Sequence, residues 1–445
     1  MQEGRLLNQD VDTIEAEKRD LKKGAVQVLS GFGVRIVARI ILLSFVARVY
    51  GVSDFGRLGE TVAIVELLAA FSIFGVNKTL LGEMKRDDEG ARLASKVMDA
   101  IVLTSLISGA ITIGMWFLWP FLSTPSLSTS QFVLLGIPLI AVTEVATTGT
   151  RHFRTVFWDT LVKTLIKPWS FLLFAVAAYY SLIGSTLFSS GGITSEQALL
   201  GAYTGSLLLT AIFAMLVLAK FFGAQGQLKV YRPSFDGVLG LARRSWPIAL
   251  NETGLFAFRR IDIIILAAVA GPKATGVYYL AQQIGTIVEK VRYLFEPMLA
   301  PIVAQSPSIS TVAAHLRRLA LFIFSTQLAI ILLVAIAGTA VLEWFEMNTA
   351  GALFVIVAIL LGELFDGTFG LSELPMVYRH PVWPPRLVGI ALALEVTLVW
   401  VWAEPLGALG AALGFAIAML ILAILRLITI RQLYGIKIFG RIAEP

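Results

Sequence analysis

Two residue types that carry much of protein chemistry are scarce in this sequence. It contains no cysteine and only three histidines among its 445 residues. The absence of cysteine excludes disulfides, thiolate metal sites and a cysteine nucleophile. We expect His152 and His380 in loops and His315 at the start of a helix, an arrangement too scattered for a metal site. The chain also lacks a phosphate-binding loop motif, which excludes an ATP-driven pump.

Charged residues are scarce as well. They make up 15% of the chain, whereas soluble proteins carry roughly 25%. Hydrophobic residues make up 57%, and the mean hydropathy is +0.80. Apolar runs of about 20 residues recur from end to end, and each is long enough to cross a hydrocarbon layer roughly 30 Å thick. The composition therefore predicts an all-α integral membrane protein.

The apolar runs form two sets of six. We predict about twelve transmembrane helices in two pseudo-symmetric six-helix lobes around a central cavity, over residues 24–50, 57–82, 97–119, 131–150, 158–182, 197–222, 241–270, 274–303, 316–341, 350–372, 385–403 and 406–432. The predicted division is an N-terminal tail (1–23), an N-terminal lobe (24–222), a linker (223–240), a C-terminal lobe (241–432) and a C-terminal tail (433–445). No short apolar core with a cleavage site follows the polar first 23 residues, so we interpret them as a retained cytoplasmic tail.

The basic residues are distributed asymmetrically between the predicted loops. If both termini are cytoplasmic, the external loops hold only Arg57 and Lys273. The internal segments then hold Lys85, Arg86, Arg92, Lys96, Arg151, Arg154, Lys220, Lys229, Arg232, Arg243, Arg244, Arg317, Arg318, Arg379, Arg386, Arg431, Lys437 and Arg441. The positive-inside rule predicts this bias for a correctly counted membrane protein. We therefore predict that both termini are cytoplasmic.

A stretch near the start of the chain is repeated in its second half. Residues Arg35 to Gly56 align with Phe256 to Gly276 at an offset of 220 positions, and Arg39 falls on Arg259. In each copy an apolar run with an interior arginine ends at a Gly-x-x-x-x-Gly break, and a second apolar run follows. The repeat predicts a duplicated half, in which a helix, a tight turn and a returning helix occur twice.

Charged residues inside the spans require an explanation, because each costs roughly 2.5 to 3.5 kcal/mol at the centre of a transmembrane helix. Helical spacing puts several of them on shared faces. These sets are Arg35 with Arg39, Glu252 with Arg259 and Asp262, Glu289 with Arg292 and Glu296, and Glu363 with Asp366 and Glu373, while Arg260 lies one step round the helix from Arg259. Arg48 lies nearer the outer end of its span, and we interpret it as a side chain that reaches toward the headgroups.

Two interpretations of these charged faces are open. In the first, they are interhelical ion pairs that fasten the bundle. In the second, arginines at equivalent positions of the two repeats face a shared cavity, where transporters place their substrates. Guanidinium groups bind phosphate oxygens bidentately, so a cationic cavity predicts an anionic cargo. The candidate substrate-binding residues are Arg35, Arg39, Arg259, Arg260 and Arg292, and the candidates for coupling to H+ or Na+ are Glu252, Asp262, Glu363 and Asp366.

Three segments resemble one membrane protein family, in the order in which they occur there. LLSFVARVYGVSDFGRLGETVAIVELLAAFSIFGV resembles the first two helices of Wzx-type polysaccharide flippases, in the multidrug, oligosaccharidyl-lipid and polysaccharide exporter superfamily. RRIDIIILAAVAGPKATGVYYLAQQI is similar to the passage from the seventh to the eighth helix, and AEPLGALGAALGFAIAML to the start of the last helix. Each motif is permissive alone, and the specificity comes from finding all three at the corresponding spans.

The resemblance implies a function and a location. Such flippases have two six-helix lobes around a V-shaped cavity, work by alternating access and move undecaprenyl-pyrophosphate-linked oligosaccharide from the cytoplasmic to the periplasmic leaflet. The expected location is the bacterial inner membrane, and the expected partners are this lipid-linked cargo, membrane lipids and the polysaccharide polymerase and export machinery. No nucleic acid and no cofactor is expected. The pyrophosphate is expected at Arg35, Arg39, Arg259 and Arg292.

Other functional classes are left open by the sequence. A multidrug exporter of the same superfamily has the same twelve spans, although a cationic drug requires acidic residues and the first helix offers arginines. A glycan polymerase or ligase usually has a large external loop, which is absent here. A major-facilitator transporter also has six plus six spans, but GEMKRDDEGAR lacks its loop signature. A mechanism driven downhill by product removal, with no coupling ion, is equally allowed.

Reporter fusions test the predicted topology. Fusions near residues 190 and 272 are expected to report the periplasmic side, because an odd number of predicted spans precedes each position. Fusions at both termini are expected to report the cytoplasm, since the basic residues gather on that side. A cytoplasmic signal from both internal positions would contradict the orientation.

Overall fold

The computed structural model describes residues 2–83, 91–122, 130–150, 158–159, 161–184, 194–223, 235–305, 309–346 and 351–436. All regular secondary structure in these ranges is helical. The α-helices are α1 (Gln2–Ile73), α2 (Val76–Glu83), α3 (Ala91–Leu122), α4 (Gly136–Thr150), α6 (Lys167–Gly184), α8 (Ser195–Gly223), α9 (Phe235–Ala257), α10 (Ile261–Gln305), α11 (Ile309–Trp344), α12 (Ala352–Gly370), α13 (Leu374–Arg379), α14 (Trp383–Leu406) and α15 (Ala408–Tyr434). Short turns η1 (Gln131–Leu135), η3 (Leu161–Ile166) and η5 (Leu371–Glu373) join some of them.

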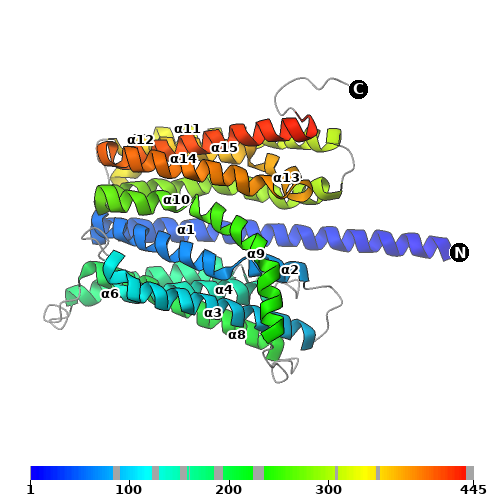
Figure 1. Cartoon of the computed structure of the whole chain (residues 1–445), viewed down its shortest axis with the longest axis horizontal. Coiled ribbons are helices and arrows are strands. Elements are labelled where there is room, and N and C mark those ends of the chain that lie inside the picture. The colour runs from blue at the N-terminus through cyan, green and yellow to red at the C-terminus, as the bar shows by residue number, and fades with distance from the viewer. Residues whose placement is uncertain are drawn as a thin grey trace.

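The helices form two groups (Figure 1). Helices α1 to α8 make up the N-terminal lobe, and α10 to α15 make up the C-terminal lobe. Since α1 and α10 each fold back at a turn, and α9 forms one broken crossing together with the first segment of α10, the described chain crosses the membrane twelve times, six times in each half. Eight helices are long and apolar enough to span a membrane by composition alone, and the other crossings lie in the charge-bearing α1, α9 and α10. The predicted all-α, twelve-span membrane fold is therefore confirmed.

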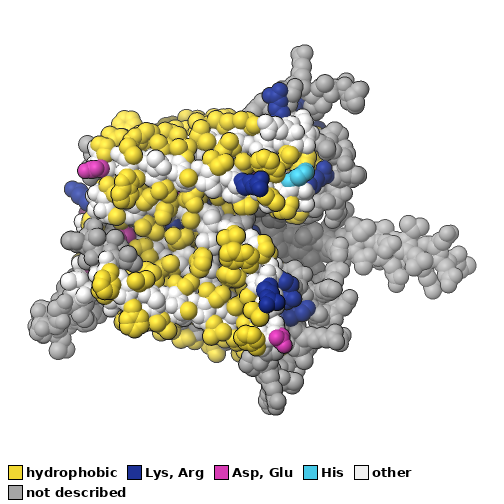
Figure 2. Space-filling model, viewed as in Figure 1, with side chains coloured by type: hydrophobic (Ala, Val, Ile, Leu, Met, Phe, Trp, Pro, Cys, Tyr) yellow, Lys and Arg dark blue, Asp and Glu magenta, His cyan; other side chains and the backbone are white. Residues whose placement is uncertain are grey.

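The outer surface of both lobes is apolar (Figure 2). Large hydrophobic side chains cover the visible face, while the basic side chains on it lie toward the ends of the helices. Phe117, Ile336 and Phe121 expose 71%, 81% and 86% of their surface. An apolar surface this extensive requires lipid rather than water as its solvent.

The two predicted Gly-x-x-x-x-Gly breaks are tight turns with matching geometry. Gly51 has φ 86° and ψ 165°, and Gly271 has φ 77° and ψ 178°. This region of backbone conformation is essentially restricted to glycine. The same rare conformation at equivalent positions of the repeat supports the predicted duplication. We call the end of the bundle at these turns the Gly51 end, and the opposite end, toward which the N-terminus projects, the tail end.

The lobes touch at the Gly51 end through equivalent residues of the repeat. A Cβ atom on Gly56 would lie 1.8 Å from the carbonyl oxygen of Pro272 and 2.7 Å from the amide nitrogen of Gly276, so only glycine allows this approach. Gly59 packs against Tyr279, its own equivalent at the same offset. Contacts between equivalent residues are what a two-fold axis between the halves produces. At the tail end, Gly75 approaches the backbone of Ala249, so the lobes meet at both ends.

Helix α9 departs from the prediction. Leu241 packs with Val76 and Leu80 of the N-terminal lobe, and the Ser245 hydroxyl donates to Thr79 Oγ1 at 3.0 Å. The division at residue 241 stays a prediction, but the first half of α9 lies against the other lobe, as Figure 1 shows. The helix then stops at Ala257, and α10 begins at Ile261. The predicted continuous span over 241–270 was wrong at residues 258–260, where the chain forms a turn.

The Gly51 turn predicts a sharp difference between two glycine substitutions. Gly51→Ala is expected to destabilise the protein by about 1–3 kcal/mol, because alanine must adopt a conformation that it avoids. Gly109→Ala in α3 is the control, since its Cβ meets no atom within 4 Å, and alanine favours a helix by up to about 1 kcal/mol. Thermal unfolding midpoints of the purified proteins in detergent measure the difference, and equal midpoints for the two variants would contradict the assignment.

Candidate functional site

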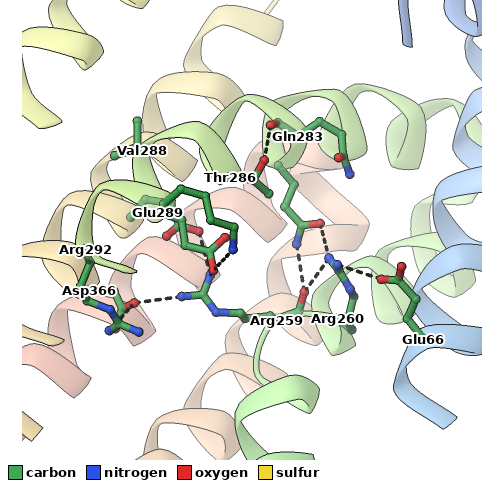
Figure 3. A network of polar contacts seen from close by, with 12 residues as sticks. Glu66, Arg259, Arg260, Gln283, Thr286, Val288, Glu289, Arg292 and Asp366 are labelled. Carbon is green, nitrogen blue, oxygen red and sulfur yellow. Dashed lines mark hydrogen bonds and ion pairs between the residues drawn. The ribbon is translucent and has the colours of Figure 1, made fainter. Parts of the chain in front are cut away.

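Arg259 and Arg260 lie in the break between α9 and α10 and point in opposite directions (Figure 3). The Arg259 guanidinium enters the C-terminal lobe, whereas that of Arg260 reaches the N-terminal lobe. The break exposes the carbonyl of Arg259, which accepts a hydrogen bond from Gln282 Nε2 at 3.1 Å. Neighbouring residues of a regular helix lie about 100° apart, so the turn allows the wider divergence of these two side chains.

Arg259 is surrounded by carboxylates. Its Nη1 lies 3.3 Å from Glu289 Oε1 and 3.2 Å from Glu363 Oε1, and its Nη2 lies 2.9 Å from Asp366 Oδ2. Asp366 also binds Arg292 at 3.0 Å and Arg426 at 2.7 Å, so three arginines converge on one buried carboxylate. Glycine at position 370 makes room for this, because a Cβ there would lie 1.9 Å from Arg292 Nη1.

These residues form a balanced set, which we call the C-lobe network. Within the described part of the chain it contains four cations and four carboxylates: Arg259, Lys290, Arg292, Arg426, Glu289, Glu363, Asp366 and Glu373. They come from the α9–α10 break, α10, α12, η5 and α15. Equal numbers of opposite charges leave no formal excess, so for Arg259, Arg292, Glu363 and Asp366 the geometry favours fastening of the helices over binding of an anion.

A second group spans the boundary between the lobes, and we call it the inter-lobe cluster. Its charged members are Arg39, Glu66, Lys167 and Arg260. Glu66 on α1 lies 3.0 Å from Arg260 and 3.6 Å from Lys167. Arg39 donates to Gln283 Oε1 on α10, and Arg260 donates to the neighbouring Gln282 Oε1 at 3.0 Å. Its four charged side chains carry a formal charge of +2, and the carboxylates of Asp262 and Glu289 are further electrostatic neighbours of Arg260.

An apolar cavity of about 450 Å³ adjoins the inter-lobe cluster. It lies between α1, α10 and α11, with walls that include Ile36, Leu43, Ile284 and Val341. Arg39 and Lys290 also line it, and so does Trp344. The cavity thus combines apolar walls from both lobes with two cationic side chains.

Trp344, which lines this cavity, also contacts Arg48. Trp344 donates from Nε1 to Ser44 Oγ at 2.8 Å, and the Arg48 guanidinium lies 4.6 Å from the centre of the Trp344 ring. Arg48 also donates to the Trp344 carbonyl oxygen. Its side chain is 39% exposed, so it reaches the surface as predicted and in addition connects α1 to α11 of the other lobe.

The predicted coupling carboxylates lie in different environments. Glu252 is partly exposed on α9 and pairs with Lys78 of the N-terminal lobe at 2.5 Å. Asp262 is fully buried, where it accepts hydrogen bonds from the Tyr278 hydroxyl and from the Ile263 amide. Glu395 on α14 is an electrostatic neighbour of Asp262 and is also fully buried. Both of its carboxylate oxygens lack a hydrogen-bond partner in the described chain.

The outcome for the predicted site is mixed. Arg39 and Arg260 belong to one cluster, whereas Arg259 and Arg292 belong to the C-lobe network. The side chain of Arg35 lies outside the described residues. The sequence analysis missed the charged side chains Glu60, Glu66, Lys167, Glu395 and Arg426. A charge within an apolar run was the available signal for Glu395 and Arg426, whereas Glu60 and Glu66 share one run and Lys167 follows Lys163 by four residues.

Comparisons with known proteins identify the family and the fold. Residues 21–306 match the profile of a family described as "Polysaccharide biosynthesis protein". No curated protein matches the chain by sequence. Among solved structures, the lipid II flippase MurJ in an inward closed conformation is 12% identical, with a TM-score of 0.72 over 91% of this chain and 87% of that one.

Two multidrug transporters also share the fold. A multidrug resistance MATE family transporter of the MOP superfamily, in an inward-facing conformation, is 13% identical, with a TM-score of 0.68 over 92% of this chain and 98% of that one. The MATE multidrug transporter DinF-BH is 16% identical, with a TM-score of 0.60 over 94% of this chain and 97% of that one. These TM-scores show a common fold. Identities this low do not show which cargo this chain carries, so the cargo has to be argued from the site.

The C-lobe network predicts a strong effect of one substitution on stability. Arg426→Leu is expected to destabilise the protein by about 3–5 kcal/mol, because it leaves the buried Asp366 and the partly buried Glu373 with one cation fewer. The control is Arg431→Leu, further along α15, where the side chain is exposed. The yield and unfolding midpoint of each purified variant measure the effect. Equal values for the two variants would show that the network does not fasten the lobe.

Proposed function

Because this chain belongs to the polysaccharide biosynthesis protein family and has the fold of membrane transporters, we propose that it is a transporter and not an enzyme. Its cargo is an undecaprenyl-pyrophosphate-linked oligosaccharide, which it moves from the cytoplasmic to the periplasmic leaflet of the bacterial inner membrane for surface polysaccharide export. Both termini are cytoplasmic in this proposal, and a polysaccharide polymerase and the export machinery receive the product.

The inter-lobe cluster carries the proposal. Three of its four charged side chains are basic, and they come from both lobes. Arginine guanidinium groups bind pyrophosphate oxygens bidentately and stay charged when they are desolvated. The partners of Arg39 include the neutral amide of Gln283, which a pyrophosphate oxygen can replace without leaving a buried carboxylate unpaired. The cluster therefore suits an anionic headgroup held between the lobes.

The neighbouring cavity supports the lipid-linked nature of the cargo. A flippase must pass sugars and a pyrophosphate across the hydrocarbon while the polyprenyl chain remains in lipid. In the cavity, apolar side chains of α1, α10 and α11 stand beside Arg39 and Lys290. A prenyl chain adjacent to its own pyrophosphate needs this combination of apolar walls and cations.

Alternating access requires contacts between the lobes that form and break. In the described chain, the ion pairs that cross the boundary include Glu66–Arg260 at 3.0 Å, Lys78–Glu252 at 2.5 Å at the tail end and Arg48–Glu346 at 3.8 Å. In the proposal, the pyrophosphate competes with Glu66 for Arg260. Binding of the cargo thus weakens the Glu66–Arg260 ion pair between the lobes. Coupling to H+ or Na+ is assigned to Asp262, with Glu395 beside it, since Glu363 and Asp366 are already paired with arginine.

A cation-coupled multidrug exporter is the second candidate, because two multidrug transporters share the fold. The charge of the inter-lobe cluster opposes this alternative. A cationic drug placed there would meet three like charges, and Glu66 is the carboxylate that pairs with them directly. Like charges disfavour binding strongly where water is scarce.

Substitution of Arg39 tests the proposed cargo. Arg39→Ala is expected to lower glycan export by about tenfold to a hundredfold, since a charge-assisted hydrogen bond contributes roughly 1.5–3 kcal/mol. Arg39→Lys keeps the positive charge but lacks the planar guanidinium that binds two oxygens at once. Its glycan export is therefore expected to lie between that of the wild type and that of Arg39→Ala. The measurement is surface glycan in cells that lack their own transporter, normalised to the folded protein in the membrane.

The control for this experiment is Arg318→Ala, which removes an exposed arginine from α11. It is expected to leave export unchanged. Full export by the Arg39→Ala, Arg260→Ala double variant at normal protein levels would eliminate the inter-lobe cluster as the pyrophosphate site.

A further inference from the structure

Three charged side chains of the N-terminal lobe have no role in the site described so far. Lys163 in η3 lies 2.7 Å from Glu144 on α4 and 3.0 Å from Asp159, which precedes it by four residues. Lys167, four residues after Lys163, contacts Glu66 at 3.6 Å. The three side chains therefore extend the inter-lobe cluster along the fourth and fifth crossings, and we call them the polar row.

The polar row faces the boundary between the lobes rather than lipid. Residues four apart share one face of a helix, so Lys163 and Lys167 point to the same side. Glu66, the partner of Lys167, also binds Arg260 of the other lobe, so that side is the boundary. Leu165 follows Lys163 by two residues and lies on the opposite side, where it is exposed as expected of an apolar side chain in lipid.

The backbone is irregular at the point where the two lysines emerge. Residues Leu161–Ile166 form a turn of π-helix, a rare conformation that is frequent at functional sites. Pro168 follows this turn, and it has no amide hydrogen to donate to the carbonyl of Thr164, as a regular α-helix requires. The sequence thus specifies an interruption of the fifth crossing beside the polar row.

The polar row has the chemistry of a sugar site. The side chains of Glu144 and Lys163 are 32% and 23% exposed, so a ligand can reach both. A carboxylate accepts hydrogen bonds and an ammonium group donates them, whereas sugar hydroxyls do both. Two carboxylates and one ammonium group give the row a formal charge of −1, which disfavours an acidic sugar or a phosphate. The row therefore suits an uncharged sugar.

A buried hydroxyl without a partner lies beside the inter-lobe cluster. Tyr203 on α8 is 3% exposed, and its hydroxyl has no hydrogen-bond partner in the described chain. Its electrostatic neighbours include Glu66 and Arg260. Leaving a buried hydroxyl unpaired is costly, and a sugar hydroxyl placed there would remove the cost.

The order of these features across the boundary matches the order of groups in the proposed cargo. The apolar cavity between α1, α10 and α11 has Arg39 in its wall. Arg39 and Arg260 both lie near Glu66, and Lys167 leads from Glu66 to Lys163. Apolar walls, arginines and the polar row thus follow one another, as a prenyl chain, a pyrophosphate and a sugar do in the cargo.

We propose that Glu144 and Lys163 bind the uncharged sugar that follows the pyrophosphate, and that the Tyr203 hydroxyl contributes beside the inter-lobe cluster. Glu144 accepts hydrogen bonds from sugar hydroxyls, and Lys163 donates to them. The fifth crossing begins at the tail end (Figure 1), so the row lies on the cytoplasmic side of the cluster in the proposed orientation. The inference rests on the proposed cargo and names the part of it that the N-terminal lobe recognises.

Two lipids separate the sugars from the pyrophosphate in a binding experiment. The purified protein in detergent is titrated with undecaprenyl pyrophosphate, and separately with the undecaprenyl-pyrophosphate-linked oligosaccharide extracted from the native host. Native mass spectrometry gives the Kd of each, and we call the ratio of the two Kd values the glycan preference. The wild type is expected to bind the oligosaccharide-linked lipid about tenfold to a hundredfold more tightly, because hydrogen bonds to charged groups are strong.

The charge variants are expected to change one of the two affinities. Glu144→Gln and Lys163→Gln should each lower the glycan preference about tenfold and leave the Kd for undecaprenyl pyrophosphate unchanged. Tyr203→Phe removes a hydroxyl that pairs with nothing in the described chain, so it should preserve the fold and lower the preference about threefold to tenfold. The controls are Glu404→Gln on α14 and Lys273→Gln on α10, which remove exposed charges and should leave both Kd values unchanged.

The outcomes distinguish a sugar site from a fastening of α4 to η3. A glycan preference that persists in folded Glu144→Gln and Lys163→Gln would overturn the proposal, and so would an equal loss of affinity for both lipids. If either charge variant fails to fold, Tyr203→Phe decides, and an unchanged preference in that variant overturns the proposal.

The wild type separates this inference from the proposed function. If it binds both lipids equally, the sugar site is excluded while the pyrophosphate site stands. If it binds neither lipid, the proposed function fails and this inference fails with it.

Discussion

A charged side chain inside hydrocarbon is tolerated only with a counter-charge or with water, and this constraint organises the C-terminal lobe. Three arginines from distant parts of the sequence meet at Asp366, whose side chain is only 5% exposed. Removing any one of them changes the environment of the others, because all share the same carboxylate. The network thus couples α10, α12 and α15 more specifically than apolar packing, which tolerates sliding and repacking.

Close backbone approach is the second constraint, and it acts between the lobes. Gly56 and Gly276 bring two main chains together where any side chain would clash. Such a contact has few side-chain atoms to bury, so it is held mainly by its surroundings. The ion pairs Glu66–Arg260 and Lys78–Glu252 cross the same boundary. Apolar side chains of α1 and α10 also pack together in a core shared by both lobes, so these backbone contacts and ion pairs add to an extensive apolar interface.

Local features of the fold were predictable from the sequence. The spans follow from apolar runs, and the turns at Gly51 and Gly271 follow from glycine pairs that end those runs. Such signals lie within a few residues of the structure that they specify. The break at residues 258–260 was not predictable in this way, because its cause lies far along the chain. Glu66 and Asp366, which hold the two diverging arginines, are separated from them by 194 and 107 residues.

The candidate site was predictable in composition but not in arrangement. A cationic first helix was evident, and Arg39 does lie at the boundary between the lobes. Which arginines are balanced by carboxylates depends on how α10, α12 and α15 pack, and spacing along one helix does not determine that. Arg426 shows the difficulty, since its span is otherwise apolar and its two carboxylate partners lie 53 and 60 residues away.

The duplicated arginines have diverged in their surroundings. Arg39 and Arg259 occupy equivalent positions of the repeat, yet the partners of Arg39 include a neutral amide and a hydroxyl, with Glu66 as an electrostatic neighbour, while Arg259 contacts three carboxylates. A single ancestral half assembled as a symmetric pair would have had to use one arginine for every purpose. Two copies within one chain carry no such restriction, so equivalent arginines can take different partners. The difference in charge around Arg39 and Arg259 is therefore one that a homodimer of identical halves could not provide.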